Sequence, residues 1–261
     1  MQKGRVDAVK VSPFKSNKMS TIFKKLSILL GFLILNYSLS AQYIYRYRPF
    51  LDPTIAVGNG LIFTASIIAQ KQVKPLEDKV IFGLNINDVN RIDRVACAQW
   101  SPNAAKVSDG LALSAGLMYS YFLFHPETRK ESINIGGVAF QSLLLSQSLS
   151  NAFKLTCRNR PYLYNQSVRI EEKRKADARM SFFSAHTSTV SSLCFSFAFA
   201  HNVYHPKSNQ TGIWIGAITI PAIEGFLRVK AGKHYPSDVI TGYLIGLGSS
   251  FIMHYLHKKR T

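Results

Sequence analysis

Long apolar runs, broken by single polar residues, alternate along the chain with shorter polar segments that contain proline or glycine. Runs of this length are typical of helices, and few segments show the strict alternation of a half-buried strand. The pattern predicts helices over six ranges: 55–71, 108–124, 133–154, 186–203, 211–228 and 237–256. We therefore expect an all-α, single-domain six-helix bundle, because 261 residues suffice for one core and no internal repeat is visible.

Two long connections, over about 72–107 and 155–183, separate these predicted helices. Loops of that length inside a compact domain are often functional. The helical domain is expected to cover 55–258, preceded by an aromatic arm over 42–54. We interpret the aromatic residues of this arm, and Trp100, as packing or interfacial anchors.

The N-terminal extension, residues 1–41, has the features of an export signal. From Met19 it reads MSTIFKKLSILLGFLILNYSLSAQ, with a lysine pair, a short apolar run and small residues before Gln42. An N-terminal membrane helix is the alternative, although the apolar run is short for a span. We expect export to the cell envelope, where the protein is membrane-associated or periplasmic.

The hydropathy pattern leaves two environments open for the bundle. The segment VITGYLIGLGSSFIMHYL is apolar enough to be a candidate membrane span, whereas other helices carry polar residues such as Asn59, Gln147 and Glu224. Both a membrane bundle and a soluble or peripheral protein fit this pattern.

The charge narrows the choice of partners. A formal net charge of +18 favours anionic partners, namely nucleic acid, anionic lipid surfaces or phosphorylated substrates. The sequence has no basic helix interleaved with aromatic residues, no zinc-finger spacing and no RNA-binding sheet signature, so we expect no nucleic acid partner. Three cysteines, Cys97, Cys157 and Cys194, have no paired spacing and are interpreted as packing residues; no metal-ligand cluster is visible.

Three short stretches concentrate residues suited to phosphate chemistry, each at a predicted helix end on one side of the bundle. They are KLTCRNRPYLYN at 154–165, SFFSAHTS at 181–188 and RVKAGKHYPSD at 228–238. In the third, a neutral His234 could attack phosphorus, with Asp238 bonded to the other ring nitrogen to fix its tautomer. Arg228 would direct its planar fork at phosphate oxygens, oriented by Glu224 through an i,i+4 pair.

The other two stretches supply an acid and further phosphate ligands. Ser184 is a candidate helix N-cap, where free backbone N–H groups can hold phosphate oxygens while His186 protonates the leaving oxygen. Lys154 and Arg160 are cations for the charge that spreads over the phosphoryl oxygens in the transition state.

Jointly, the three stretches resemble the signature of the type 2 phosphatidic acid phosphatase and vanadium-dependent haloperoxidase superfamily, whose members are helical bundles with a histidine nucleophile. The family pattern is a lysine, six residues and Arg-Pro; then Pro-Ser-Gly-His; then Ser-Arg, five residues, His, three residues and Asp. The motif likeness covers about 154–242. It implies that His234 is the nucleophile, Asp238 its orienting partner and Arg228 a phosphate ligand.

The chain departs from this family pattern within the second and third motifs. Leu227 stands where the family often has serine, Phe183 replaces proline and Ala185 replaces glycine. Because alanine keeps its N–H, Ala185 still binds phosphate if the position does not require a positive φ.

The first motif departs more. Only five residues separate Lys154 from Arg160, and one missing residue on a continuous helix rotates the lysine by about 100°. Either a local change of turn restores Lys154 to the site or Arg158 takes its part.

The remaining histidines lie at predicted helix ends, and we interpret them as caps or solvated groups. They are His125, His201, His205, His254 and His257.

The sequence and the resemblance together predict a metal-independent phosphatase that hydrolyses a phosphomonoester or pyrophosphate through a phosphohistidine intermediate, without a cofactor. A lipid phosphate is the favoured substrate class, and the expected partners are this substrate and a membrane or membrane surface. A soluble phosphomonoester stays open. The alternatives are a haloperoxidase that holds vanadate in the same pocket, and a non-catalytic phosphate-binding protein of the envelope.

Overall fold

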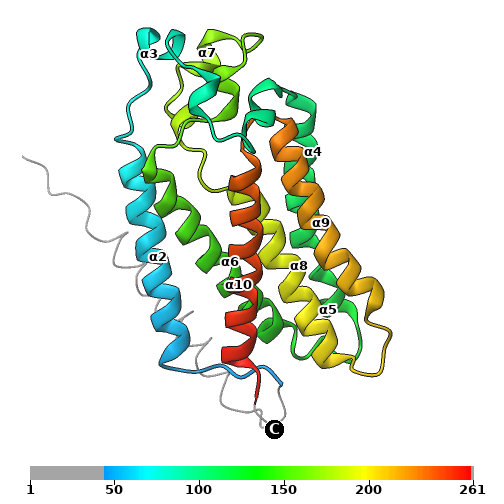
Figure 1. Ribbon diagram of the computed structural model, residues 1–261. Helices are drawn as coiled ribbons and strands as arrows, with labels where there is room; N and C mark the ends of the chain where they lie inside the picture. Colours follow the sequence, from blue (N-terminus) through cyan, green and yellow to red (C-terminus); the bar gives the residue numbers. More distant parts are fainter. Residues whose placement is uncertain (1–43, 260–261) are drawn as a thin grey trace, which may run out of the picture. The chain divides into compact units, whose positions relative to one another are not determined.

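A computed structural model describes residues 44–259, and the expected export signal at 1–41 lies outside them. The described residues form an all-α bundle (Figure 1). Its long helices are α2 (Leu51–Gln70), α4 (Pro102–Leu117), α6 (Ser132–Phe153), α8 (Ala185–Tyr204), α9 (Thr211–Lys230) and α10 (Pro236–His257). The shorter helices are α3 (Asp78–Phe82), η2 (Ile86–Asp88), η3 (Arg94–Ala98), α5 (Ser120–Phe124), η4 (Lys154–Thr156), η5 (Pro161–Tyr164), α7 (Ile170–Lys173) and η6 (Ala176–Arg179).

The six predicted long helices are confirmed, and the differences have local causes. Helix α2 begins at Leu51, so the end of the expected arm over 42–54 is helical. Helix α4 begins at Pro102, because the hydroxyl of Ser101 accepts a hydrogen bond from the Ala104 amide (3.2 Å) and proline suits the first helical position. The predicted helix over 108–124 is divided, since α4 ends at Leu117 and α5 follows.

The two long connections contain short helices that gather at one end of the bundle, where Figure 1 labels α3 and α7. Tyr162 and Leu163, both on η5, are buried there. The Trp100 ring packs edge-on against Tyr162, with 5.4 Å between ring centroids, which confirms its expected packing role. The aromatic arm is also anchored, because Tyr45 is buried against the rings of Tyr204 and His254.

Helix α8 lies at the centre of the bundle and packs against α4, α6, α9 and α10. Its contact with α10 is very close, and glycine makes this possible. A Cβ atom added at Gly242 would lie 2.6 Å from the carbonyl oxygen of Ser184, and one added at Gly246 would lie 2.5 Å from that of Ser188. The close contact fixes the first turn of α8 against α10.

Replacing Gly246 with alanine is expected to destabilise the bundle by about 1–3 kcal/mol, because the added methyl group meets backbone atoms of α8 that have little room to move. Gly248 is the matched control on the same helix, since a Cβ there meets nothing within 4 Å. Gly248→Ala should be neutral or stabilising by up to about 1 kcal/mol through helix propensity. Thermal unfolding of both variants in detergent measures the difference, and equal unfolding temperatures would contradict the close contact.

The outer faces of α2, α9 and α10 carry large exposed apolar side chains, among them Leu61, Phe226 and Phe251. Three helices, α2, α9 and α10, are long and apolar enough to cross a membrane by length and composition. The polar residues that argued against a span at the sequence level point inward: Asn59 accepts a hydrogen bond from Ser148 (2.7 Å), and Glu224 is fully buried. These polar groups are therefore compatible with an apolar exterior.

Candidate active site

The three sequence stretches meet at one end of the bundle, as expected. The N-termini of α8 and α10 and the C-termini of α6 and α9 lie there, next to the capping loops. Gly232 allows the tight turn from α9 to α10: its φ is +69°, and a Cβ would clash with the Gln99 carbonyl oxygen. The Gly232 carbonyl accepts a hydrogen bond from the Tyr162 amide (3.1 Å), which ties this turn to η5.

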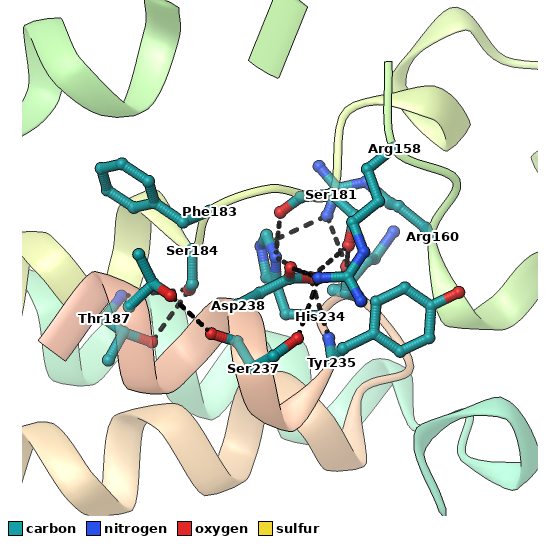
Figure 2. A network of polar contacts seen from close by, with 12 residues as sticks. Arg158, Arg160, Ser181, Phe183, Ser184, Thr187, His234, Tyr235, Ser237 and Asp238 are labelled. Carbon is teal, nitrogen blue, oxygen red and sulfur yellow. Dashed lines mark hydrogen bonds and ion pairs between the residues drawn. The ribbon is translucent and has the colours of Figure 1, made fainter. Parts of the chain in front are cut away.

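His234 is buried at the centre of the site (Figure 2). Its Nδ1 lies 2.7 Å from the Ser181 carbonyl oxygen, which can only accept, so Nδ1 carries the proton. Nε2 lies 3.3 Å from Nη1 of Arg160, which can only donate, so Nε2 presents its lone pair. Burial holds the pKa of His234 well below its usual value, which keeps the imidazole neutral at neutral pH. This tautomer is the one that a nucleophile needs.

Asp238 lies behind His234, although not as its closest acceptor. The carboxylate Oδ2 is 3.6 Å from Nδ1 of His234, whereas the Ser181 carbonyl oxygen is at 2.7 Å. Oδ2 also accepts hydrogen bonds from the Ser181 hydroxyl (2.5 Å) and from the Tyr235 amide (3.0 Å). The fully buried carboxylate therefore orders the segments on both sides of the histidine ring and would face a positive charge on that ring.

Arg158 holds Asp238 from the other side (Figure 2). Its Nη1 donates to Asp238 Oδ1 and, at 2.9 Å, to the Ser237 hydroxyl, while Nη2 pairs with Asp93 at 2.7 Å. The buried Asp93 in turn accepts from the Ser237 amide and hydroxyl (2.9 and 2.7 Å). Arg158 thus holds the two carboxylates of Asp93 and Asp238, which leaves the part expected of Lys154 to Lys154 itself.

Arg160 is buried beside His234. Its Nε and Nη2 donate to the backbone oxygen and carboxylate of Asp177, both at 2.8 Å, and Nη1 donates to the Lys233 carbonyl oxygen at 2.9 Å. These bonds fix the guanidinium with Nη1 beside Nε2 of His234. A phosphoryl group on Nε2 of His234 would thus meet an oriented cation.

Arg228 and Glu224 do not form the direct pair expected from their i,i+4 spacing. Instead, the Ser108 hydroxyl connects them, because it donates to Glu224 Oε1 and accepts from Arg228 Nη1 at 3.3 Å. Nε of Arg228 is buried and has no hydrogen-bond partner among the described residues. This buried guanidinium therefore has unused donor capacity for an anion.

His186 lies in the first turn of α8 and contacts Asp109 of α4. The distance from Nε2 of His186 to Oδ1 of Asp109 is 3.0 Å, and the same oxygen lies 3.6 Å from Nη1 of Arg228. The carboxylate of Asp109 is 63% exposed, so solvent reaches the space between His186 and Arg228. The Asp109 carboxylate thus already places a negative charge between His186 and Arg228.

Lys154 reaches the same cluster of cations despite its shortened spacing. Helix α6 ends at Phe153, and the 3₁₀ turn η4 with a left-handed Cys157 (φ 55°) follows. The 100° rotation expected for Lys154 assumed a helix that continues to Arg160, and the chain forms no such helix there. Burial lowers the pKa of Lys154 to about 8, and the charge of the nearby Arg160 adds to the effect. Within the described residues the ammonium group has no ion-pair partner.

Ser184 caps α8 as expected, accepting from the amide and hydroxyl of Thr187 at 3.3 and 2.9 Å. Ala185 begins the helix with an ordinary backbone, since the non-glycine residues with positive φ in the described part of the chain comprise Cys157 alone. Alanine therefore replaces the family's glycine without strain, and its N–H remains at the helix N-terminus.

The sequence analysis missed the residues that support the site from outside the three motifs. Asp93, Ser108 and Asp109 belong to a long loop and to α4, 65 to 144 residues away from their partners. A pairing over such distances leaves no local pattern. Ser181 is within the second stretch, but its role depends on its carbonyl oxygen, which every residue has.

Comparisons with known proteins give matches over parts of the chain. Residues 136–261 match the family model of the PAP2 superfamily. The lipid A 4'-phosphatase of Porphyromonas gingivalis is 25% identical over 146 residues, which cover 54% of this chain and 58% of that relative. Among solved structures, a transmembrane PAP2 type phosphatidylglycerolphosphate phosphatase from Bacillus subtilis superposes with a TM-score of 0.47 at 19% identity, over 78% of this chain and 96% of the other. The family-model match thus agrees, over residues 136–261, with the resemblance to this superfamily that the three motifs carry.

Proposed function

We propose that this protein is a metal-independent phosphatase that releases phosphate from a lipid phosphomonoester or pyrophosphate through a phosphohistidine at His234. The observation that carries the proposal is the fixed tautomer of a buried histidine whose free lone pair faces a cationic cluster. Nδ1 is bound to the Ser181 carbonyl oxygen, Nε2 lies against Arg160, and unpaired donor groups of Lys154 and Arg228 are nearby.

The first chemical step follows from this geometry. Nε2 of His234 attacks phosphorus and the bond from phosphorus to the leaving oxygen breaks, while His186 gives that oxygen a proton. The positive charge that develops on the imidazole faces the carboxylate of Asp238. Lys154, Arg160 and Arg228, with the hydroxyl of Ser184 and the amide of Ala185, stabilise the phosphoryl oxygens.

The second step returns the enzyme to its starting state. Water attacks the phosphohistidine, His186 accepts its proton, and the bond between Nε2 and phosphorus breaks to release inorganic phosphate. Every charge change is met by a side chain already present, so the proposal needs no metal ion. We infer that the substrate phosphate takes the position of the Asp109 carboxylate between His186 and Arg228.

A pocket beside the phosphate site supports a lipid substrate. Its volume is about 310 Å³, and its lining is almost entirely apolar: Thr187, Pro221, Ala222, Gly225, Phe226, Val239, Ile240, Tyr243 and Leu244. The pocket shares Thr187 with the site, because the Thr187 hydroxyl donates a hydrogen bond to that of Ser184 (2.9 Å). We propose that a hydrocarbon chain of the substrate occupies it.

The relatives and the helix exteriors point to the same class of substrate. A relative named as a lipid A 4'-phosphatase acts on a lipid phosphate, as its name states. The exposed faces of α9 and α10 carry Ile218, Phe226, Ile240 and Phe251, among other large apolar residues. We propose that these faces contact the hydrocarbon of a membrane, with the active site at one end of the bundle, in the cell envelope.

Filling the pocket should separate lipid from soluble substrates. Ala222→Trp is expected to lower kcat/KM for a lipid phosphate by roughly 30-fold, because displacing two to three methylene groups at about 0.8 kcal/mol each costs about 2 kcal/mol. It should leave a soluble phosphomonoester within about twofold. The matched control is Ile223→Trp, on the exposed face of the same helix and outside the pocket lining. Equal losses on both substrates would argue against a hydrocarbon chain in this pocket.

The proposed function is tested by phosphate release from a lipid phosphate, a polyprenyl pyrophosphate and a soluble phosphomonoester, in detergent, with and without a chelator. We expect preferred release from a lipid substrate, and the same rate with the chelator. Loss of activity with chelator, restored by a divalent ion, would contradict metal independence. Oxidation of halide that depends on vanadate and peroxide, without phosphate release, would favour the haloperoxidase alternative.

A further inference from the structure

A second cluster of titratable side chains lies at the other end of the bundle. His125 directly follows α5, Glu127 is in the same turn, and His205 directly follows α8. Each offers one ligand atom, and these atoms lie within 4.8 Å of one another. Helix α8 begins at the active site and ends at this cluster, which separates the two by about 30 Å at 1.5 Å per residue.

The contact between His205 and Glu127 has the spacing of two metal ligands. Nδ1 of His205 lies 3.0 Å from Oε2 of Glu127. Two ligands of a tetrahedral zinc ion, each about 2.0–2.1 Å from the metal, lie about 3.3 Å apart. A zinc ion could therefore replace the proton between Nδ1 of His205 and Oε2 of Glu127 after a small outward movement of the two side chains. Nε2 of His205 lies 3.4 Å from the hydroxyl of Tyr121, the kind of outer partner that orients a metal-bound imidazole.

His125 supplies an independent indication of a ligand. Its Nδ1 is buried and has no hydrogen-bond partner among the described residues. Its ring lies 4.6 Å from that of His205, measured between centroids. A buried ring nitrogen without a partner is costly, and an ion bound by the cluster would account for it.

The turns that carry the two histidines are well ordered by hydrogen bonds. The His125 carbonyl oxygen accepts from the amides of Thr128 (3.1 Å) and Arg129 (3.0 Å). The His205 carbonyl oxygen accepts from the Ser208 amide (3.0 Å) and from the Gln210 side chain (2.6 Å). Ligands on such fixed turns lose little freedom when they bind an ion.

We propose that His125, Glu127 and His205 bind one zinc ion, with a remaining position open to water. Two imidazoles and one carboxylate suit zinc better than magnesium or calcium, which prefer oxygen ligands. The ion would join the turn after α5 to the end of α8 and so stabilise this end of the bundle. Because the ion would lie far from His234, its role would be structural. Such a site is compatible with a phosphatase reaction that uses no metal. The ligands are 80 residues apart, which explains why no spacing motif marks them.

The test is a zinc titration of tag-free, chelator-treated protein against a chromophoric competitor, together with thermal unfolding. We expect one zinc ion per chain and a rise in unfolding temperature with zinc. Glu127→Gln and His205→Ala should each weaken binding by at least about 100-fold, since even outer partners of a metal site are worth 10- to 100-fold. Glu171→Gln, on the exposed α7, is the matched control and should bind as the wild type does.

Glu127 is the decisive variant because its side chain is 69% exposed, so its loss should leave the fold intact without zinc. Its phosphate release should equal that of the wild type. Wild-type protein that takes up no stoichiometric zinc, or Glu127→Gln protein that binds zinc as tightly as the wild type, would overturn the proposal.

Discussion

Replacing His234 with alanine is expected to lower kcat for phosphate release on the order of 10⁴-fold or more, because removal of a nucleophile ends covalent catalysis. The loss should appear in kcat and leave KM within a few-fold, since the proposed phosphate ligands Lys154, Arg160 and Arg228 remain in place. Initial rates on the preferred lipid phosphate measure this loss.

The low pKa of His234 adds a second expectation for the wild type. Because the proposed nucleophile stays neutral below pH 6.5, His234 does not set the acid limb of the pH profile of kcat.

Folding of the His234→Ala protein has to be checked separately, because the residue is buried. His234→Gln retains most of the side-chain volume and is the matched variant. Both should unfold near the wild-type temperature and should still bind vanadate, a phosphate analogue. Retention of a tenth of the wild-type rate in either folded variant would exclude His234 as the nucleophile.

The second large effect is expected from Asp238→Asn, with a loss in kcat on the order of 10²- to 10⁴-fold, by analogy with removal of the buried carboxylate behind a catalytic histidine. In the proposed mechanism the carboxylate faces the charge that forms on His234, and in the structure it accepts hydrogen bonds from Arg158 and Ser181. An amide removes the charge and places donors against a guanidinium. Steady-state kinetics with the lipid phosphate measure the change.

Asp93→Asn is the matched control for Asp238→Asn. Asp93 is also buried and also binds Arg158, but it contacts Ser237 and not His234. We expect a loss of roughly 10-fold, the effect of a partner that orients a site from outside. Equal losses in the two variants, with equal unfolding temperatures, would mean that Asp238 acts only through the Arg158 network.

The long helices and their meeting point could be predicted because both depend on local patterns. Apolar runs and end residues such as Pro236 mark the helices, and the motif stretches lie at those ends. The Ser101-Pro102 start of α4 also had a local signal, that of an N-cap followed by proline at the first helical position, but the apolar run that begins later concealed it.

The rest of the site depends on contacts that no local pattern encodes. The direct pairing of Glu224 with Arg228 was wrong because Ser108, from another helix, lies between them. The rotation expected for Lys154 assumed a continuous helix, whereas the chain turns directly after Phe153. A side chain from another helix therefore decides the first case, and the turn after α6 decides the second.

The most direct test of the account is to trap the covalent intermediate. Wild-type protein is mixed with a lipid phosphate, quenched within milliseconds in alkali, which preserves phosphohistidine, and digested for mass spectrometry. We expect one phosphorylated residue, His234, in the wild type and none in the His234→Ala protein. Rapid turnover without any phosphohistidine at residue 234, or phosphorylation of a different residue, would contradict it.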